Sequence, residues 1–568
     1  MIRHDRAGLL ALCCLTAGAT VLRAQTPAGP RYLPPESPPG ASSTAAVRTA
    51  SGLVRGTVAT SGVRTFRGLP YAAPPVGDLR WREPQPVAAW KGVRAATRFG
   101  PRCMQLPVFA DMVFRSDGMS EDCLYLNVWA PARKAGGRAP VLLYFYGGGF
   151  VAGDGSEPRY DGGSLARRGI VVVTANYRLG VFGFLAHPTL TAESPHHASG
   201  DYGLLDQVAA LAWVRRNIAA FGGNPARITI AGESAGSISV CALMASPLSR
   251  RLIAGVIGES GGMIRPTLPP LLLADAEQRG AAFADSVGAR SLAALRATAA
   301  ESLLAATGRP GNRRFAATID GYFLPAAPAD VFAGGRQARV PLLVGWNTEE
   351  AGWRALLGEA EPTPGNYEAA LRRLFGARAD EALALFPAST AGQVEANGML
   401  LAGAAFIGYS TWKWAELQRG TRQPVYRYLY AHPRPAVRDT IRNPPHPGAV
   451  IPESAMRAAQ PTPPSSDAAS SGAVHSAEIE YALGNLATND VYGWTPDDDA
   501  LSAVMQAYVA NFVRTGNPNG TGLPAWPAAF AGDTARHMVL DVPPHAEAAP
   551  HEDVYRFLDR FYAQPPQR

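Results

Sequence analysis

The turn at residues 232–236 constrains the fold of this chain more than any other segment. It reads GESAG, follows a short β-branched run and precedes a segment that can start a helix. Gly232 and Gly236 remove the side chains that would block so sharp a turn. The turn therefore predicts that Ser234 is lifted above the edge of a sheet, with the amide of Ala235 beside it at a helix N-terminus. Ordinary Gly-rich turns share this pattern, so the rest of the chain must provide a base, an acid and further main-chain donors.

The apolar runs of the chain predict its fold class. Residues 141–146 and 170–175 are apolar without alternation, which is typical of strands covered on both faces in a mostly parallel sheet. Residues 340–345 predict another buried strand, and residues 425–430 predict a late strand. Helical spacing over residues 204–220 ends at a Gly-Gly-Asn-Pro stop. Strands that alternate with helices predict an α/β architecture, with a large, mostly parallel central sheet flanked by helices.

Length and composition allow either one large domain or two closely packed ones, and we favour one large domain. With 568 residues and 47% apolar residues, the chain can bury an extensive core. We expect this domain over residues 48–564, with helical cover insertions at about 265–310 and 355–420. The Pro-rich connection at about 431–472 is far longer than an ordinary loop. It is expected to be a flexible flap near the site or a surface segment without structure.

The N-terminus has the pattern of a targeting segment. Residues 1–24 carry Arg3 and Arg6 before an apolar run, which resembles a secretory signal peptide with cleavage near Ala24. An uncleaved membrane anchor is the alternative, although the run is short for a membrane span. Residues 25–47 are rich in Pro, Ser, Thr and Ala and predict a flexible leader. We expect a secreted or periplasmic protein that leaves the membrane once the signal is removed.

Three cysteines remain outside the signal segment: Cys103, Cys123 and Cys241. In an oxidising compartment, Cys103 and Cys123 are close enough in sequence to close a short disulfide loop, worth about 3 kcal/mol in the chain-entropy model. Cys241 falls in the expected helix after Ser234 and should pack as a buried apolar residue.

Charge and motif patterns limit the classes of partner. The formal charge of +7 arises from scattered arginines, whereas a nucleic-acid surface shows a basic stripe. The sequence contains no zinc-protease helix pattern and no phosphate or dinucleotide loop. We therefore expect no metal, no cofactor and no nucleic-acid partner, and we favour a monomer.

Three adjacent glycines at residues 147–149 directly follow the apolar run at 141–146. By themselves they could form an ordinary flexible turn. Together with the serine turn downstream, they predict an oxyanion loop of the HGGG type, with Tyr146 in place of His. The expected donors are the main-chain N–H groups of Gly148 and Gly149.

Further segments carry a family pattern. They are FRGLPYAAPPVG at 66–77, SEDCLYLNVW at 120–129, NYRLGVFGFL at 176–185, GLLDQ at 203–207 and NFVRTGNPN at 511–519. Together with the serine turn and the glycine triplet, these segments resemble the type-B carboxylesterase and cholinesterase family of α/β-hydrolases. The resemblance runs from about Ser51 to Phe561. It implies the α/β-hydrolase fold and a catalytic triad in the chain order Ser, Glu, His.

The resemblance implies roles for residues far from the serine. The segment GWNTEEA at 345–351 resembles the acid loop and places the acid on Glu350, with its neighbour Glu349 as the alternative. The segment GAVHSAEIEY at 472–481 resembles the histidine loop, with His475 as the base.

Other positions either support or depart from the family pattern. Ser476 stands where the family usually has Gly. Glu233 and Ser260 match positions that support the histidine and its water network, and buried polar structure is the alternative for both.

The implied reaction is hydrolysis of small to medium apolar esters through an acyl-enzyme intermediate. His475 would remove the proton of Ser234, Glu350 would hold the imidazole, and the amides of Gly148, Gly149 and Ala235 would stabilise the oxyanion. Activity is then expected to fall below about pH 6.5. Amide, carbamate or lactone hydrolysis uses the same machinery, and a non-catalytic binding protein on this fold is the alternative from another class.

The Cys103/Cys123 pair matches the first loop disulfide of the family. In cholinesterases a Trp in this loop holds the substrate's quaternary ammonium. The loop here has Phe109 and Phe114 but no Trp, so choline esters are not expected as preferred substrates.

Overall fold

The computed structural model describes residues 31–32, 41–109, 111–132, 137–309, 315–438 and 472–563. The expected signal peptide at 1–24 and most of the expected flap at 431–472 lie outside the described residues.

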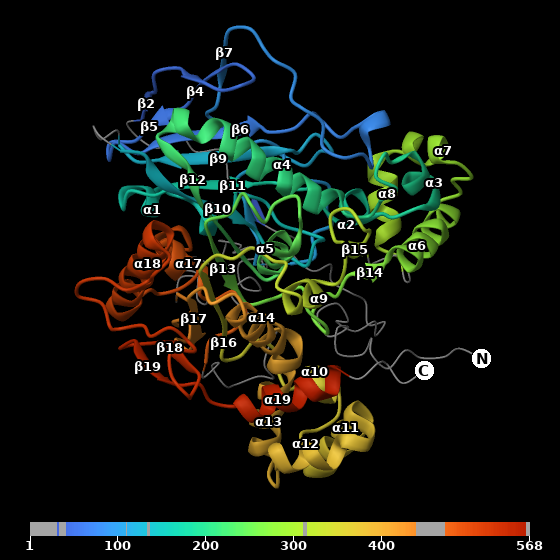
Figure 1. Ribbon diagram of the computed structural model, residues 1–568, viewed down its shortest axis with the longest axis vertical. Coiled ribbons are helices and arrows are strands. Elements are labelled where there is room, and N and C mark those ends of the chain that lie inside the picture. Colours follow the sequence, from blue (N-terminus) through green and yellow to red (C-terminus); the bar gives the residue numbers. More distant parts are fainter. Residues whose placement is uncertain are drawn as a thin grey trace, which may run out of the picture.

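A 12-stranded sheet runs through the centre of the molecule (Figure 1). Its strand order is β19-β18-β17-β16-β13-β12-β10-β11-β9-β6-β5-β2. Neighbours from β18 to β11 pair in parallel, and the pairs at both ends are antiparallel. The predicted α/β class with a mostly parallel sheet is therefore confirmed. The strands are β2 (Ser42–Ser43), β5 (Thr57–Val58), β6 (Arg64–Pro70), β9 (Tyr125–Ala130), β10 (Ala139–Phe145), β11 (Val171–Ala175), β12 (Gly223–Glu233), β13 (Gly255–Glu259), β16 (Leu342–Asn347), β17 (Val425–Tyr430), β18 (Arg536–Leu540) and β19 (His545–Ala548).

Smaller sheets lie beside the central one. Their strands are β1 (Arg31–Tyr32) with β8 (Val113–Phe114), β14 (Leu271–Leu272) with β15 (Thr318–Ile319), and β3 (Val47–Arg48), β4 (Leu53–Arg55) and β7 (Val93–Ala95) together. Within the expected leader, the described residues Ser42–Ser43 form the outermost strand of the central sheet by pairing with β5.

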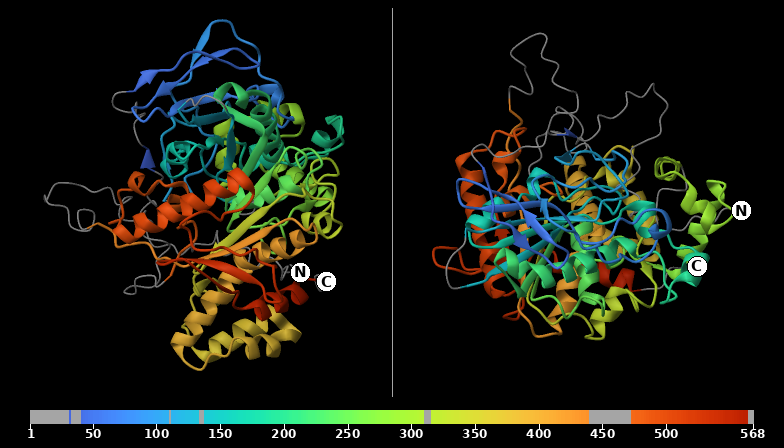
Figure 2. Two further views of the ribbon diagram at one scale, coloured as in Figure 1. Left: turned by 60° about the vertical axis from the view of Figure 1, so that its left-hand side comes forward. Right: turned by 90° about the horizontal axis from the view of Figure 1, so that it is seen from above.

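Helices flank the sheet (Figures 1 and 2). The longest helix in the described residues is α18 (Pro496–Thr515). It begins with a capping box in which the Thr495 and Asp498 side chains each accept a hydrogen bond from the other residue's backbone N–H. The other helices named below are α4 (Tyr202–Asn217), α5 (Ala235–Ala245), α6 (Leu273–Ser286), α7 (Leu292–Ala297), α8 (Ala300–Thr307), α10 (Arg354–Leu357), α11 (Pro364–Phe375), α12 (Ala379–Leu385), α13 (Ala391–Gly403), α14 (Tyr409–Arg419), α17 (Ile479–Leu483) and α19 (Glu552–Tyr562).

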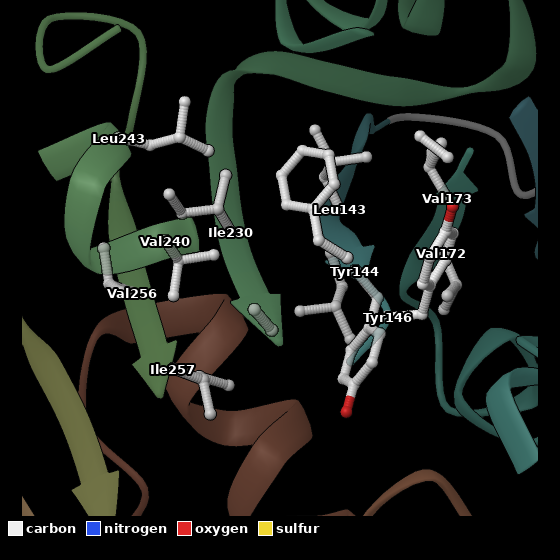
Figure 3. Close-up of a cluster of buried hydrophobic side chains, with 14 of the residues drawn as sticks. Leu143, Tyr144, Tyr146, Val172, Val173, Ile230, Val240, Leu243, Val256 and Ile257 are labelled. Carbon is white, nitrogen blue, oxygen red and sulfur yellow. The ribbon is translucent and has the colours of Figure 1, made fainter. Parts of the chain in front are cut away.

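The main core lies against the parallel strands. All five residues of β11 are buried, which explains why this strand shows no polar alternation in the sequence. Figure 3 shows Leu143 of β10, Ile230 of β12 and Val256 of β13 together with Val240 and Leu243 of α5. The helix after the serine turn is therefore buried as part of the core.

A second buried cluster lies at one end of the molecule, where α11–α13 meet the C-terminal helix α19 (Figures 1 and 2). Trp346 at the end of β16 joins this cluster, together with Leu371 and Phe557. Within the expected cover insertion at about 355–420, residues 364–385 form two helices, α11 and α12. The break follows from Gly376, whose φ of +56° favours glycine.

The order of the central strands positions the site. β16, β13, β12 and β10 are consecutive neighbours in the sheet, and all four run parallel. Their carboxyl ends therefore lie at one edge, where open α/β sheets bind their ligands. Each of the four strands is followed by a segment that the sequence analysis singled out.

Candidate active site

Ser234 occupies the sharp turn between β12 and α5. Its φ of 54° and ψ of −120° lie outside the regions that L-residues favour. A Cβ atom at Gly232 would lie 2.5 Å from the carbonyl carbon of Gly236, and one at Gly236 would overlap with the carbonyl oxygen of Phe145. Without a shift of the surrounding backbone, the turn therefore has space only for glycine at both positions.

The glycine triplet after β10 runs alongside this turn. A Cβ atom at Gly147 would lie 3.1 Å from Cβ of Ser234 and 2.7 Å from Oε2 of Glu233. Gly148 and Gly149 have φ values of 107° and 63°, which favour glycine. The triplet therefore brings bare main chain close to the serine. Ala235 is the first residue of α5, and the leading amides of a helix have no acceptor within that helix.

The loop after β16 brings a carboxylate to the predicted base. Glu350 Oε2 lies 2.5 Å from Nδ1 of His475. Its Oε1 accepts hydrogen bonds from the backbone N–H of Asn347 at 2.7 Å and from Oγ of Ser260 at 2.6 Å. The backbone N–H of Glu349 instead donates to the carbonyl of Ala473 at 2.8 Å. The carboxylate of Glu350 therefore has the position of an acid that orients the imidazole.

A second carboxylate faces the other ring nitrogen of His475. Glu233 Oε1 lies 3.2 Å from Nε2 of His475 and accepts a hydrogen bond from Oγ of Ser476 at 2.5 Å. The imidazole thus lies between two carboxylates. Burial alone would lower its pKa, but Glu233 and Glu350 raise the pKa of His475 to about 10. The pKa of His475 is therefore above the ordinary histidine value of about 6.5, on which the expected pH dependence of activity was based.

Two further glutamates lie behind this pair. Glu478 accepts hydrogen bonds from Nδ2 of Asn347 at 2.7 Å and from Oγ of Ser260 at 3.4 Å. Burial, together with Glu233, Glu259 and Glu350, raises the pKa of Glu478 well above its usual value.

Glu259, at the end of β13, accepts a hydrogen bond from the hydroxyl of Tyr144 at 3.0 Å. Burial raises the pKa of Glu259 to about 8. The buried carboxyl group of Glu259 therefore holds its proton more tightly than an exposed glutamate does.

Sequence reasoning assigned no role to Glu478, Glu259 or Asn347. Glu478 follows His475 by three residues, and Glu259 directly precedes Ser260. Their proximity to residues already singled out was the only available signal. Their contacts depend on pairing between distant strands.

The predicted disulfide between Cys103 and Cys123 is present, with a Cα–Cα distance of 5.0 Å. The side chain of Gln105, inside the closed loop, bonds to both the N–H and the carbonyl of Gly153, each at 2.9 Å. The loop is therefore tied to the chain just beyond the glycine triplet. Cys241 is a buried free thiol, as expected.

One face of the imidazole meets an aromatic ring. The ring of Phe406 lies edge-on to His475, with centroids 5.3 Å apart. Phe406 belongs to a single π-helical turn between α13 and α14 (Ala404–Gly408), and such turns occur frequently at functional sites.

Within the residues that the structure describes, no group of three or more His, Cys, Asp and Glu side chains is placed to hold a metal ion. None of the helices in the described part of the chain is both long and apolar enough to cross a membrane.

Comparison with known proteins decides the family. The model of the carboxylesterase family matches residues 43–558. The chain belongs to this family.

Similar proteins cover most of this carboxylesterase. The fumonisin B1 esterase of Sphingopyxis macrogoltabida is 37% identical over 506 residues, which cover 84% of this chain and 83% of that protein. The para-nitrobenzyl esterase of Bacillus subtilis is 33% identical over 516 residues, 87% of this chain and 94% of that protein.

Solved structures of carboxylesterases share the fold. A PNB esterase structure superimposes with a TM-score of 0.72 at 32% identity and covers 90% of this chain and 98% of its own. The Geobacillus stearothermophilus carboxylesterase EST55 gives a TM-score of 0.73 at 31% identity, with 90% and 99% coverage. The predicted family, the α/β-hydrolase fold and ester hydrolysis by a serine hydrolase mechanism are thereby confirmed, in preference to a non-catalytic binding protein.

Proposed function

We propose that Ser234, His475 and Glu350 are the catalytic triad of this carboxylesterase. The observation that carries the proposal is the 2.5 Å contact between Glu350 and His475, at the sheet edge where the strained turn presents Ser234. Oγ of Ser234 would attack the ester carbonyl carbon as its proton passes to Nε2 of His475. The imidazolium would then return the proton to the leaving alcohol oxygen as the C–O bond breaks. Water would repeat the two steps on the acyl-enzyme to release the acid.

The oxyanion of both tetrahedral intermediates would be held by the amides of Gly148, Gly149 and Ala235. Each such donor contributes on the order of 10²- to 10³-fold in rate. Glu233 and Ser260 would support the reaction through the imidazole and the acid, which they contact.

The test of the triad is Ser234→Ala. We expect hydrolysis of a p-nitrophenyl ester to fall by at least about 10⁴-fold. The melting temperature should change little, because the variant keeps the glycines that define the turn. Turnover retained within tenfold of wild type would contradict the assignment of the nucleophile.

The substrates we propose are small to medium apolar esters. The aromatic ring of Phe406 against His475 supports an apolar surround, and the relatives' names include a fumonisin B1 esterase and a para-nitrobenzyl esterase. A panel of p-nitrophenyl esters of increasing acyl length, with a matched anilide, carbamate and lactone, measures this range. A higher kcat/KM for the anilide, carbamate or lactone would replace the ester assignment.

We further propose that the protein is exported, with cleavage near Ala24, and works as a monomer of one domain. The disulfide between Cys103 and Cys123 supports export, because disulfides persist in oxidising compartments. N-terminal sequencing of the mature protein and its mass in solution would test cleavage and the monomer. A mature chain that begins at Met1 would contradict cleavage.

A further inference from the structure

Ser476 adopts a backbone conformation that its residue type does not favour. Its φ of +66° lies in the left-handed region, which disfavours residues that carry a Cβ atom. A glycine would adopt this conformation without strain. The serine hydroxyl, however, makes a contact that glycine cannot, a 2.5 Å hydrogen bond to Oε1 of Glu233.

The main chain of Ser476 is held from another direction. Its carbonyl accepts a hydrogen bond from Nη2 of Arg434 at 3.1 Å. The same guanidinium donates to Oε2 of Glu480 and to the hydroxyl of Tyr492, both at 3.1 Å. Arg434 lies four residues beyond the end of β17. Ser476 therefore links the loop of His475 both to the nucleophile turn and to the segment that follows β17.

The hydroxyl acts on an atom that also faces the base. Oε1 of Glu233 lies 3.2 Å from Nε2 of His475 and is the same oxygen that accepts the Ser476 hydrogen bond. A hydrogen bond donated to a carboxylate favours its ionised form. An ionised Glu233 in turn stabilises the imidazolium that forms when His475 takes a proton.

We propose that Ser476 is a positioning residue of the catalytic base, whose hydroxyl holds the side chain of Glu233 in place against Nε2 of His475. The proposal rests on the triad proposed above. It assigns a role to a side chain whose backbone conformation favours glycine.

Other charged groups face the same pair and stay constant when Ser476 is changed. His475 is faced by Glu350 and Glu478 as well as by Glu233. Burial raises the pKa of Glu233, whereas His475, the Ser476 hydrogen bond and Arg159 lower it, and Glu350 raises it further. Loss of the hydroxyl should therefore leave more Glu233 protonated and make the imidazole a weaker base.

The test compares Ser476→Ala with Ser476→Gly. Both variants remove the hydroxyl, but only glycine also relieves the left-handed backbone. We expect both to move the acidic limb of kcat/KM toward lower pH by about one unit and to lower kcat at the plateau. Ser476→Thr retains a hydroxyl and should keep the wild-type midpoint. Ser389→Ala, at an exposed serine between α12 and α13, is the matched control and should leave the profile unchanged.

A measurement without substrate separates this proposal from the proposed triad. ¹⁵N NMR of histidine-labelled protein, assigned with His475→Gln, reports the imidazole pKa directly. A downward shift of that pKa in both Ser476 variants supports the proposal, even if Ser234→Ala fails to abolish turnover. An unchanged imidazole pKa in both variants overturns it, as does a shift in Ser476→Ala alone, which would assign the effect to the backbone.

Discussion

The nucleophile turn and the histidine loop reach the same edge of the sheet by different means. The turn around Ser234 is fixed by backbone sterics, because Gly232 and Gly236 leave no space for a side chain. The loop around His475 is held mainly by side chains from other parts of the chain, among them Glu350 and Arg434. The position of the nucleophile is therefore largely a local property, whereas the position and basicity of the base depend on long-range polar contacts.

This difference predicts different kinds of failure. Changes in the histidine loop should alter rate and pH dependence while the fold persists. Changes in the turn should disturb stability and rate together, since the same glycines pack α5 against β10.

The largest effect is expected for Glu350→Gln, on the histidine side. The amide keeps the size of the side chain but loses the charge that orients the imidazole and stabilises the imidazolium, and such a change costs about 10⁴-fold in kcat. Kinetics with a p-nitrophenyl ester would measure the loss, and the melting temperature would show that the fold persists. Glu349→Gln is the matched control, for which we expect kcat within about threefold of wild type. A loss of similar size in the control would move the acid to Glu349.

A smaller but broader effect is expected for Gly236→Ala in the turn. The added Cβ overlaps with the carbonyl oxygen of Phe145, so β10 and α5 must separate. We expect the free energy of unfolding to fall by about 2–4 kcal/mol, and kcat/KM to fall by about 10²-fold through misplacement of Ser234. Denaturant unfolding and steady-state kinetics measure the two losses.

Gly392→Ala provides the control for that variant. Gly392 lies in α13, where an added Cβ would meet no atom within 4 Å. Alanine there should leave activity unchanged and raise stability by up to about 1 kcal/mol. A Gly236→Ala protein as stable as Gly392→Ala would show that the turn is not fixed by sterics.

The smallest effect is expected for Glu259→Gln and concerns stability. Burial raises the pKa of Glu259 from 4.5 to about 8. Between these values the folded protein keeps a proton that the unfolded chain releases, so the stability from this group is present below pH 4.5 and is lost as pH rises toward 8.

Glutamine should remove this dependence, since its carbonyl can still accept from Tyr144. Between pH 5 and pH 8, the melting temperature of the variant should decrease less than that of the wild type. At pH 8 the variant should be the more stable protein. If the melting temperatures of the two proteins change equally between pH 5 and pH 8, Glu259 is already ionised in the folded state.

Local patterns predicted much of the fold. The continuous apolar run of β11 and the helical spacing of α4 were both visible in the sequence. A strand buried on both faces is apolar at every position, whereas a helix buried on one side has apolar residues at every third or fourth position. The short strand β13 was not predicted. It has only five residues, two of them glycine, and becomes a strand through pairing with β12 and β16.

Some residues of the candidate site were likewise predicted from the sequence, and others were not. Resemblance to the family pointed to Glu350 and His475, and the structure brings their side chains into contact. Arg434 and Gln105 had no signal of their own, because each works through a backbone atom tens of residues away. Such partners are determined by tertiary contacts between distant segments of the chain.

The sequence by itself determined the α/β order of elements, the glycine-dependent turn and the residue types needed for ester hydrolysis. The first two follow from periodicity and from backbone sterics, which act over a few residues, and the third follows from the resemblance to the family. Only the tertiary structure decided which carboxylates face His475 and which polar side chains hold each of them. Glu233 and Ser476 are 243 residues apart in sequence, yet they share a hydrogen bond in the folded protein. Burial and charge at that point depend on every segment that packs around it.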